Sequence, residues 1–120
     1  MIVTTTRITV SAANRSELFQ TLLTLVPPVQ NEKGCLSYHF YLDSADNNSV
    51  LLIEEWEGEA DWENHLRSKE CAVFLGAVRV LCGPASFDFK LLSYVAGVEA
   101  IAAARANGAM DVFPQSRELR

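Results

Sequence analysis

The sequence predicts an α+β fold in which helices cover one face of a four-stranded antiparallel sheet. Four segments are rich in β-branched and alternating apolar residues, which is typical of strands. Between them lie segments in which apolar residues recur every three or four positions, as on one face of a helix. The order is strand, helix, strand, strand, helix, strand, the split β-α-β plan, and 120 residues suffice for one such domain.

The first strand and helix are predicted within residues 2–34. The strand covers residues 2–10, with Ile2, Ile8 and Val10 on one face and Thr5, Arg7 and Thr9 on the other. Asn14 and Glu17 resemble a capping box, and an apolar stripe follows at helical spacing: Leu18, Leu22, Leu25 and Val29. Pro27-Pro28 predicts a kink, because the apolar phase continues beyond it. We expect the helix to reach about Glu32, with Gly34 as its C-terminal cap.

Residues 35–42 and 49–56 are predicted to form a hairpin, joined by the turn-rich residues 43–48. One face of its first strand carries Leu36, Tyr38, Phe40 and Leu42. In its second strand Glu54 and Glu55 must point to opposite faces of the sheet. A buried carboxylate needs partners, and the sequence does not decide which of these two glutamates is buried.

Two more helices and the last strand follow. A short helix is predicted from about Glu59 to Leu66, and a longer helix begins after Ser68, whose side chain can cap it. The apolar stripe of the longer helix consists of Cys71, Phe74, Leu75, Val78 and Leu81. Gly83-Pro84 is a strong stop signal. The final strand ends near Tyr94, and its apolar residues alternate with polar ones: Phe87, Phe89 and Leu91.

Both faces of the sheet are expected to be covered. The final strand and the hairpin each present an alternating apolar set, and only one face can meet the chain's own helices. We therefore predict a homodimer packed sheet to sheet.

The C-terminal part is predicted to be an addition to this unit. The domain is expected to span residues 1–94, and residues 95–120 to form a helix and tail. Val98, Ile101 and Ala102 give the helix a narrow apolar strip, and it is too short to be stable alone. We expect it to lie against the second protomer. The alternative is a helix that rests on its own domain or frays.

Composition excludes several classes of protein. The net charge is −5 and no basic cluster stands out, which argues against nucleic acid as a partner. No apolar run approaches the roughly 20 residues that span a bilayer, and the first residues do not resemble a signal peptide. Three cysteines without a Cys-x-x-Cys pair indicate reduced packing residues in a cytoplasmic protein. Two histidines 26 positions apart, with no ligand spacing of a known type, do not predict a metal site.

Residues 50–66 concentrate the chemistry of the chain. Trp62, His65 and Leu66 share one helix face, and Trp56 lies at the end of the preceding strand. His65 can be a helix-surface or core histidine with a satisfied hydrogen bond. It can also be a general base, since histidine titrates near neutral pH.

The aromatic residues allow two interpretations as well. Trp56 and Trp62 are core residues in the simpler one, and in the other they stack on a planar substrate. Tyr38 is expected to pack under the helices, where its hydroxyl can bond a phenol. Phe74 is a candidate for the pocket wall.

Three segments resemble the antibiotic biosynthesis monooxygenase family, and within it the bacterial quinol monooxygenases. They are Gly34-Cys35-Leu36-Ser37-Tyr38, Ile53-Glu54-Glu55-Trp56-Glu57 and His65-Leu66. The resemblance covers about residues 2–94 and implies a ferredoxin-like protomer and a dimeric α/β barrel. Family members include cofactor-independent oxygenases, haem-degrading enzymes and a signal-molecule isomerase. Haem-degrading members carry an asparagine on the first strand, where this chain has Thr4-Thr5-Thr6, which argues against haem breakdown.

The sequence thus leads to two hypotheses of function. The first is a cofactor-independent monooxygenase that oxidises a quinol or related phenol with O₂. His65 would be the catalytic base, Trp56, Trp62 and Tyr38 would hold the ring, and Phe74 would form the wall. No cofactor and no metal are expected. The second hypothesis is a non-catalytic small-molecule-binding or stress-associated dimer on the same fold.

Overall fold

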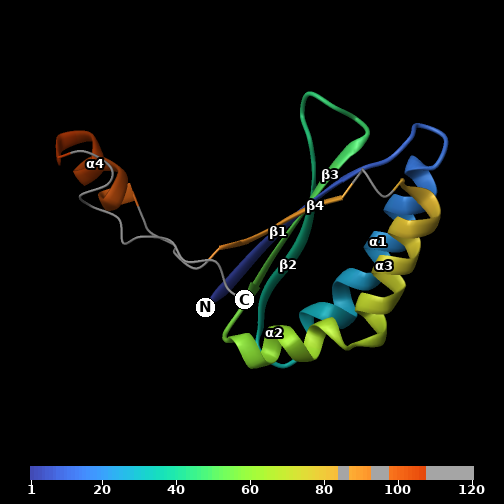
Figure 1. Cartoon of the computed structure of the whole chain (residues 1–120), viewed down its shortest axis with the longest axis horizontal. Helices are drawn as coiled ribbons and strands as arrows, with labels where there is room; N and C mark the ends of the chain where they lie inside the picture. The colour runs from blue at the N-terminus through green and yellow to red at the C-terminus, as the bar shows by residue number, and fades with distance from the viewer. Residues whose placement is uncertain (84–86, 93–97, 108–120) are drawn as a thin grey trace.

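The computed structural model describes residues 1–83, 87–92 and 98–107 (Figure 1). The strands are β1 (Ile2–Thr9), β2 (Cys35–Leu42), β3 (Ser49–Trp56) and β4 (Phe87–Leu92). The helices are α1 (Arg15–Gln30), α2 (Glu59–Leu66), α3 (Lys69–Leu81) and α4 (Val98–Asn107). The predicted order of elements is confirmed, although residues 93–97, where the last strand was expected to end, lie outside the described residues.

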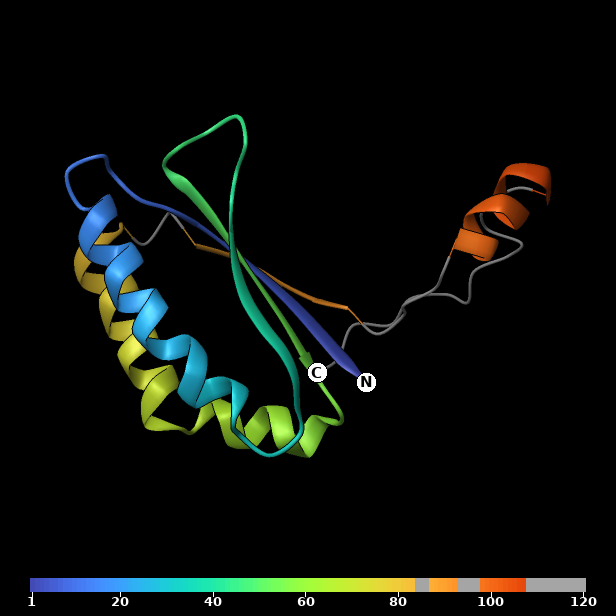
Figure 2. The ribbon, with the colours of Figure 1, turned by 180° about the vertical axis from the view of Figure 1, so that it is seen from behind.

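The four strands form one antiparallel sheet in the order β2-β3-β1-β4. Helices α1 and α3 pack side by side and, with α2, lie on one side of the sheet, while the other side has no helix over it among the described residues (Figures 1 and 2). This is the ferredoxin-like α+β arrangement that the sequence predicts.

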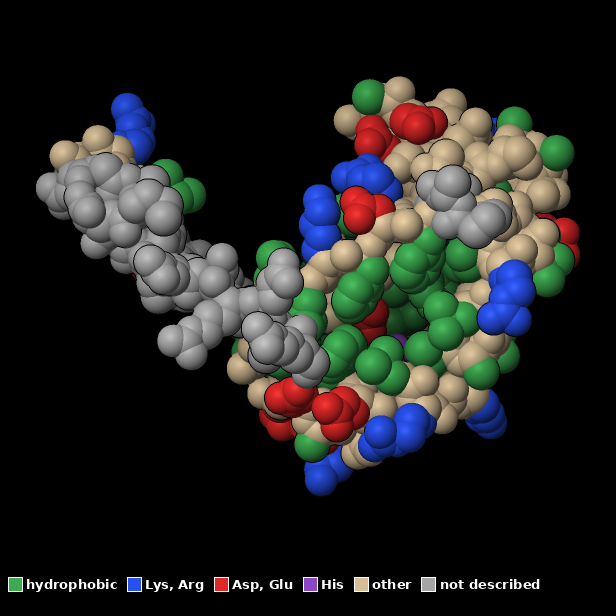
Figure 3. All heavy atoms as spheres, in the orientation of Figure 1, with side chains coloured by type: hydrophobic (Ala, Val, Ile, Leu, Met, Phe, Trp, Pro, Cys, Tyr) green, Lys and Arg blue, Asp and Glu red, His purple; other side chains and the backbone are tan. Residues whose placement is uncertain are grey.

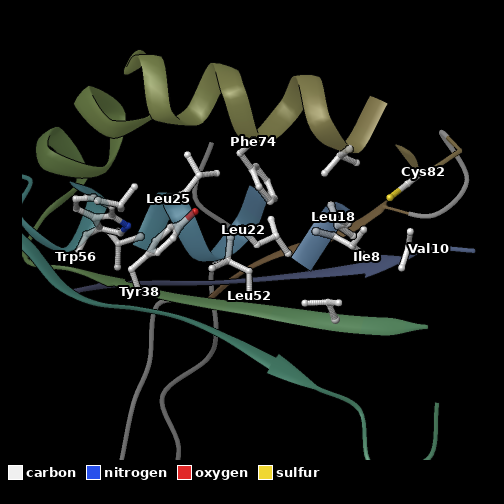
Figure 4. Close-up of a cluster of buried hydrophobic side chains, with 14 residues drawn as sticks. Ile8, Val10, Leu18, Leu22, Leu25, Tyr38, Leu52, Trp56, Phe74 and Cys82 are labelled. Atoms are coloured by element: carbon white, nitrogen blue, oxygen red, sulfur yellow. The ribbon is translucent and has the colours of Figure 1, made fainter. Parts of the chain in front are cut away.

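The core lies between the sheet and these helices (Figure 4). All four stripe residues of α1 are buried, as their spacing predicts: Leu18, Leu22, Leu25 and Val29. From the sheet, Ile8, Leu52 and Tyr38 point toward them, and Phe74 approaches from α3 (Figure 4). The apolar faces of strand and helix meet in this core, and their burial removes apolar area from water.

The ends of α1 differ from the prediction. Asn14 makes no side-chain cap; its Nδ2 instead donates to the carbonyl of Leu81, which fastens the start of α1 to the end of α3. The C-terminal cap is Asn31, so the expectation of a helix reaching Glu32 with Gly34 as its cap is wrong. Pro27-Pro28 lies inside the last turn on the exposed side, where water can bond the carbonyls that lack N–H partners.

Gly34 has a different role, at the entry to β2. Its φ is +81°, a conformation that glycine adopts without strain. A Cβ at this position would collide with the side chain of Asp61, so α2 sits directly against the backbone there. The carbonyl of Gly34 also accepts a 2.8 Å hydrogen bond from the N–H of Glu57. This turn thereby fixes the segment before β2 against the start of α2.

The two apolar sets that motivated the predicted dimer lie on the same face. Phe89 pairs with Thr6, Thr6 with Leu52 and Leu52 with Phe40, so all four residues share one row facing the helices. The expectation that one of these sets lies on the face away from the helices is therefore wrong, while the homodimer itself stays a prediction. A bulge between Cys35 and Ser37 interrupts the alternation of side chains at the start of β2, and Leu36 is half exposed.

The outer face of the sheet is mixed in character. Its rows combine polar and apolar side chains: Ser37, Glu55, Val3 and Leu92 in one, His39, Ile53, Thr5 and Lys90 in the next, and Tyr41, Leu51, Arg7 and Asp88 in the third. Tyr41 and Leu92 are exposed in the single chain. This face therefore offers apolar area beside charged residues, among them Lys90 and Asp88 on the β4 edge.

Helix α3 begins as predicted. Ser68 Oγ accepts a 3.1 Å hydrogen bond from the N–H of Cys71, which is the expected N-cap. Cys71, Phe74 and Val78 are buried, while Leu75 is exposed on the flank of the stripe. None of the helices in the described ranges is both long and apolar enough to cross a bilayer.

Helix α4 stands away from the sheet and its helices (Figures 1 and 2). Val98 and Ile101, the larger residues of its apolar strip, are 77% and 60% exposed in the single chain. The division at residue 94 and the contact with a second protomer stay predictions.

Candidate functional site

A buried histidine between two carboxylates is the centre of the candidate site. His65 Nδ1 lies 3.0 and 3.2 Å from the two carboxylate oxygens of Glu32. His65 Nε2 lies 3.4 Å from Oε1 of Glu54. His65 itself is only 4% exposed. Both nitrogens of the imidazole therefore face an acid.

Each residue of this group comes from a different part of the fold. Glu54 is on β3, next to Thr4 of β1 in the sheet, and His65 is in the last turn of α2. Glu32 belongs to the short segment between α1 and β2 that the Gly34 turn holds against α2. The site consequently forms only when the sheet, the segment between α1 and β2, and α2 are assembled.

Glu54 is the buried glutamate of the pair that the sequence left open. It points to the helix side because it shares a face with Leu52 and Trp56, and Glu55 points to the outer face. Its carboxylate accepts a 3.1 Å hydrogen bond from Thr4 Oγ1 and a 3.2 Å bond from Trp56 Nε1. Burial raises the pKa of Glu54 above its ordinary value, although His65 and the two hydrogen bonds oppose the shift. A carboxylate of this kind is a stronger base than one in water.

Aromatic rings hold the imidazole from two sides. The ring of His65 stacks on the indole of Trp56 with centroids 4.7 Å apart and planes at 27°. Tyr38 meets it edge-on at 5.9 Å. Trp56 and Tyr38 are 0% and 1% exposed, so they back the site from inside the core. Burial raises the pKa of the Tyr38 hydroxyl, which stays a neutral phenol.

A hollow lined by hydrophobic side chains opens between the sheet and the helices, and acidic and histidine atoms are visible in its depth (Figure 3). Phe87 and Phe89 of β4 face the helices yet remain 37% and 43% exposed, because the helices do not close over β4. Phe74 lies 6.4 Å from Phe87, and Trp62 is parallel to Phe89 at 6.4 Å between ring centroids. These four rings lie on the helix side of the sheet, the side on which the hollow opens.

Trp62 also brings a polar atom to this region. Its Nε1 is buried, and no acceptor for it is found within the residues that the structure describes. A buried N–H without an acceptor is costly, and an oxygen of a bound molecule would relieve that cost.

The predicted site residues fall into two groups. In the buried group His65 contacts both Trp56 and Tyr38, whereas Trp62 and Phe74 pair with Phe89 and Phe87 of β4. Sequence reasoning missed Glu32 and Thr4. One feature of the sequence could have indicated Thr4, because it is a polar residue on the apolar face of β1. No pattern in the sequence indicates that Glu32 contacts His65, because that contact depends on the turn at Gly34.

The cysteines do not take part in this group as reactive thiols. All three are free, and burial raises the pKa of Cys35 to about 11, with Glu32 and Glu54 adding to the shift. Burial raises the pKa of Cys71 and Cys82 in the same direction. Over residues 1–83, 87–92 and 98–107, no cluster of three or more His, Cys, Asp or Glu side chains is arranged to hold a metal ion.

Known proteins share this fold. A protein from Pseudomonas aeruginosa is 25% identical, with a TM-score of 0.71 over 79% of this chain and 94% of its own. A protein from Mycobacterium tuberculosis is 20% identical, with a TM-score of 0.73 over 80% of this chain and 96% of its own. At such identities the likeness concerns the fold.

Sequence comparison adds the family. An uncharacterized protein of Synechocystis is 33% identical over 67 residues, which are 56% of this chain and 46% of that protein, so the match spans about half of the relative's length. The family model for antibiotic biosynthesis monooxygenases matches residues 1–77, which include β1, α1, the hairpin, α2 and the buried histidine. The chain therefore belongs to the antibiotic biosynthesis monooxygenase family.

Proposed function

We propose that this protein is a cofactor-independent monooxygenase that oxidises a quinol or a related phenol with O₂. One observation carries the proposal: a buried carboxylate–imidazole pair, Glu54 and His65, lies on the helix side of the sheet. On that side a hollow with hydrophobic walls opens, with acidic and histidine atoms in its depth (Figure 3). A base in such a place can ionise a phenol, and the surrounding apolar walls exclude water from the reaction.

The proposed reaction balances with O₂ as the only co-reactant. The base removes a phenolic proton, and the electron-rich quinolate passes one electron to O₂, giving a semiquinone and superoxide. Their combination forms a C–O bond at an unsubstituted ring carbon, and the peroxide takes up a proton. Loss of the ring C–H proton and cleavage of the O–O bond then release water. A hydroquinone and O₂ become a hydroxyquinone and water, with four electrons moved from the ring to oxygen.

The described residues suit these steps in different ways. Glu54, whose pKa is raised by burial, is the group placed to accept the phenolic proton, and His65 shares that proton. Trp62 and Phe74 contact the ring in the hollow, and Trp62 Nε1 donates to a ring oxygen. Trp56 and Tyr38 fix the imidazole from behind.

Oxygen uptake with a panel of naphthohydroquinones and benzohydroquinones tests the proposal. Turnover must exceed spontaneous autoxidation and produce the hydroxyquinone. His65→Ala should reduce kcat by about 100-fold or more, the usual scale of general-base catalysis, because Glu54 loses the partner that shares its proton. His39→Ala is the matched control for the loss of a histidine away from the site, since His39 is exposed on the outer face of the sheet. Its sedimentation is compared with that of the wild type, so that any change of assembly is separated from a change of activity. Saturable binding of quinols without oxygen consumption would favour the non-catalytic binding dimer instead.

We also propose that the protein acts as a homodimer through the outer face of its sheet. The support is the mixed face described above, where Leu51 and Ile53 of β3 lie inside the sheet and Tyr41 and Leu92 are exposed on its two edge strands. Sedimentation at micromolar concentration should give the mass of two chains. Ile53→Lys, placed in the middle of this face, should shift the mass to that of one chain.

A further inference from the structure

We propose that Glu32 is the outer end of a proton path that links the buried Glu54 to solvent through the imidazole of His65. This inference rests on the proposed function, because it concerns the proton that the bound phenol gives up. It assigns a role to a residue outside the predicted site.

The three groups form a continuous line. The distances are 3.4 Å from Glu54 Oε1 to His65 Nε2 and 3.0 Å from His65 Nδ1 to Glu32 Oε2. Catalytic hydrogen bonds are often long before a ligand binds, so the first of these distances is within working range. An imidazole can take a proton on one nitrogen while it releases one from the other.

Exposure along the line gives it a direction. The side chains of Glu54 and His65 are 8% and 4% exposed, and that of Glu32 is 22% exposed. Glu32 is thus the one member with a substantial solvent-facing surface. A ring bound in the hollow covers the direct way from Glu54 to water, which leaves the route through the imidazole.

The geometry also decides which group meets the substrate. Both ring nitrogens of His65 already face carboxylates, one face of its ring stacks on Trp56, and Tyr38 makes a T-shaped contact with it. Glu54 is therefore the group that contacts the phenol, and His65 acts behind it.

Proton movement follows in two halves. When Glu54 takes the phenolic proton, Nε2 of His65 receives a proton and Nδ1 gives one to Glu32. When the peroxide needs a proton, the transfers run in reverse, which restores the original tautomer. Exchange between Glu32 and water replaces any proton that leaves with the product.

Among the described residues, the other ionisable side chains whose pKa the two glutamates shift do not offer a competing route. They are Tyr38 on β2, Cys35 at its start and Cys71 on α3. Burial and the two glutamates raise the pKa of all three, so each keeps its proton. Thr4 and Trp56, the other partners of Glu54, act as donors only in this arrangement.

A pair of substitutions separates proton transfer from mere positioning. Glu32→Gln keeps an oxygen that accepts from Nδ1 of His65 but cannot carry a proton, and Glu32→Ala leaves room for a small carboxylate. In Glu32→Gln, kcat for quinol oxidation should fall at least about tenfold with KM little changed, since proton transfer becomes limiting. In Glu32→Ala, added formate should restore kcat with saturation. Glu57→Gln is the matched control, because Glu57 is an exposed acid whose backbone N–H bonds the carbonyl of Gly34, two positions from Glu32.

Each alternative outcome has a distinct meaning. Unchanged kcat in Glu32→Gln, or a loss in Glu32→Ala that formate does not restore, would overturn the path while the monooxygenase proposal stands. If the wild-type protein oxidises no quinol, a stopped-flow experiment tests the proton path instead. The protein is mixed with 4-nitrophenol in weakly buffered solution, and an indicator dye reports the proton that the bound nitrophenol releases. Proton release to the dye that is slow in Glu32→Gln and normal in Glu57→Gln supports the path. Equal release rates, or no ionisation of the bound nitrophenol, rejects it.

Discussion

The imidazole of His65 and the indole of Trp56 lie face to face, with centroids 4.7 Å apart. The same indole donates through Nε1 to Glu54, so a single side chain fixes both members of the carboxylate–imidazole pair. Trp56 comes from the end of β3 and His65 from the last turn of α2. Their contact places the imidazole of α2 against the Glu54 carboxylate of β3.

Trp56→Phe tests this double role. Phenylalanine keeps a flat ring under His65 but lacks the donor to Glu54, and it leaves part of the indole volume empty. We expect a loss of about 1–3 kcal/mol in unfolding free energy, measured by urea denaturation. Trp56→Ala, which also removes the stack, should cost about 3–5 kcal/mol. Equal losses in the two variants would mean that the stack contributes nothing.

Glu54→Gln should stabilise the protein while it abolishes activity. The folded-state pKa of Glu54 is raised above 4.5 by burial, so the folded state holds this proton more tightly than the unfolded chain. Its contribution to stability is full below pH 4.5 and is lost as pH rises toward the folded pKa. Glutamine avoids that loss and can still bond Thr4 and Trp56.

Thermal melts of wild-type and Glu54→Gln protein across pH 4 to 8 measure this effect. The variant's Tm should exceed that of the wild type by a few degrees at neutral pH, and the difference should shrink toward pH 4. A difference that is constant with pH would show that Glu54 has the same pKa in both states.

Gly34→Ala should be strongly destabilising. The new Cβ would require a positive φ in an alanine and would collide with Asp61. Together these effects should cost more than about 2 kcal/mol and disturb the position of Glu32. Gly76→Ala is the matched control, because a Cβ there meets no atom within 4 Å and the site is helical; it should be neutral or stabilising by up to about 1 kcal/mol. Adding Asp61→Gly to Gly34→Ala should recover the part due to the collision.

Removal of α4 tests whether this helix joins two protomers. Truncation after residue 94 removes the exposed strip of Val98 and Ile101. If α4 lies on the second protomer, the truncated dimer should dissociate at higher concentration and melt at lower temperature, as sedimentation and calorimetry would show. An unchanged dissociation constant and Tm would leave α4 without a role in the dimer.

The fold was predictable because its signals are local. Four apolar residues at helical spacing mark α1, and the alternation from Phe87 to Leu91 marks β4, whatever the rest of the chain does. The predictions failed where a residue far away in the sequence determines the local hydrogen bonding. Asn14 does not cap its own helix because the carbonyl of Leu81, 67 positions away, accepts its side-chain N–H.

The candidate site was predictable only in part, for the same reason. His65 stood out by its chemistry, and Trp56 by its place before the acidic helix. Glu54 becomes distinguishable from Glu55 once Trp56 is known to point inward, since residues 54 and 56 share a face. Glu32 meets His65 across 33 positions of sequence, and no periodicity or motif near residue 32 indicates that contact.

The long separations within the site also couple ligand binding to folding. Thr4 and Glu54 are 50 positions apart and Glu32 and His65 are 33 apart, so the unfolded chain does not hold these side chains together. A molecule that binds it must shift the unfolding equilibrium by mass action, by about 2.7 kcal/mol at a free concentration 100 times its Kd. The melting temperature of the intact chain is therefore a direct assay for ligands, and it needs neither a known reaction nor a labelled substrate.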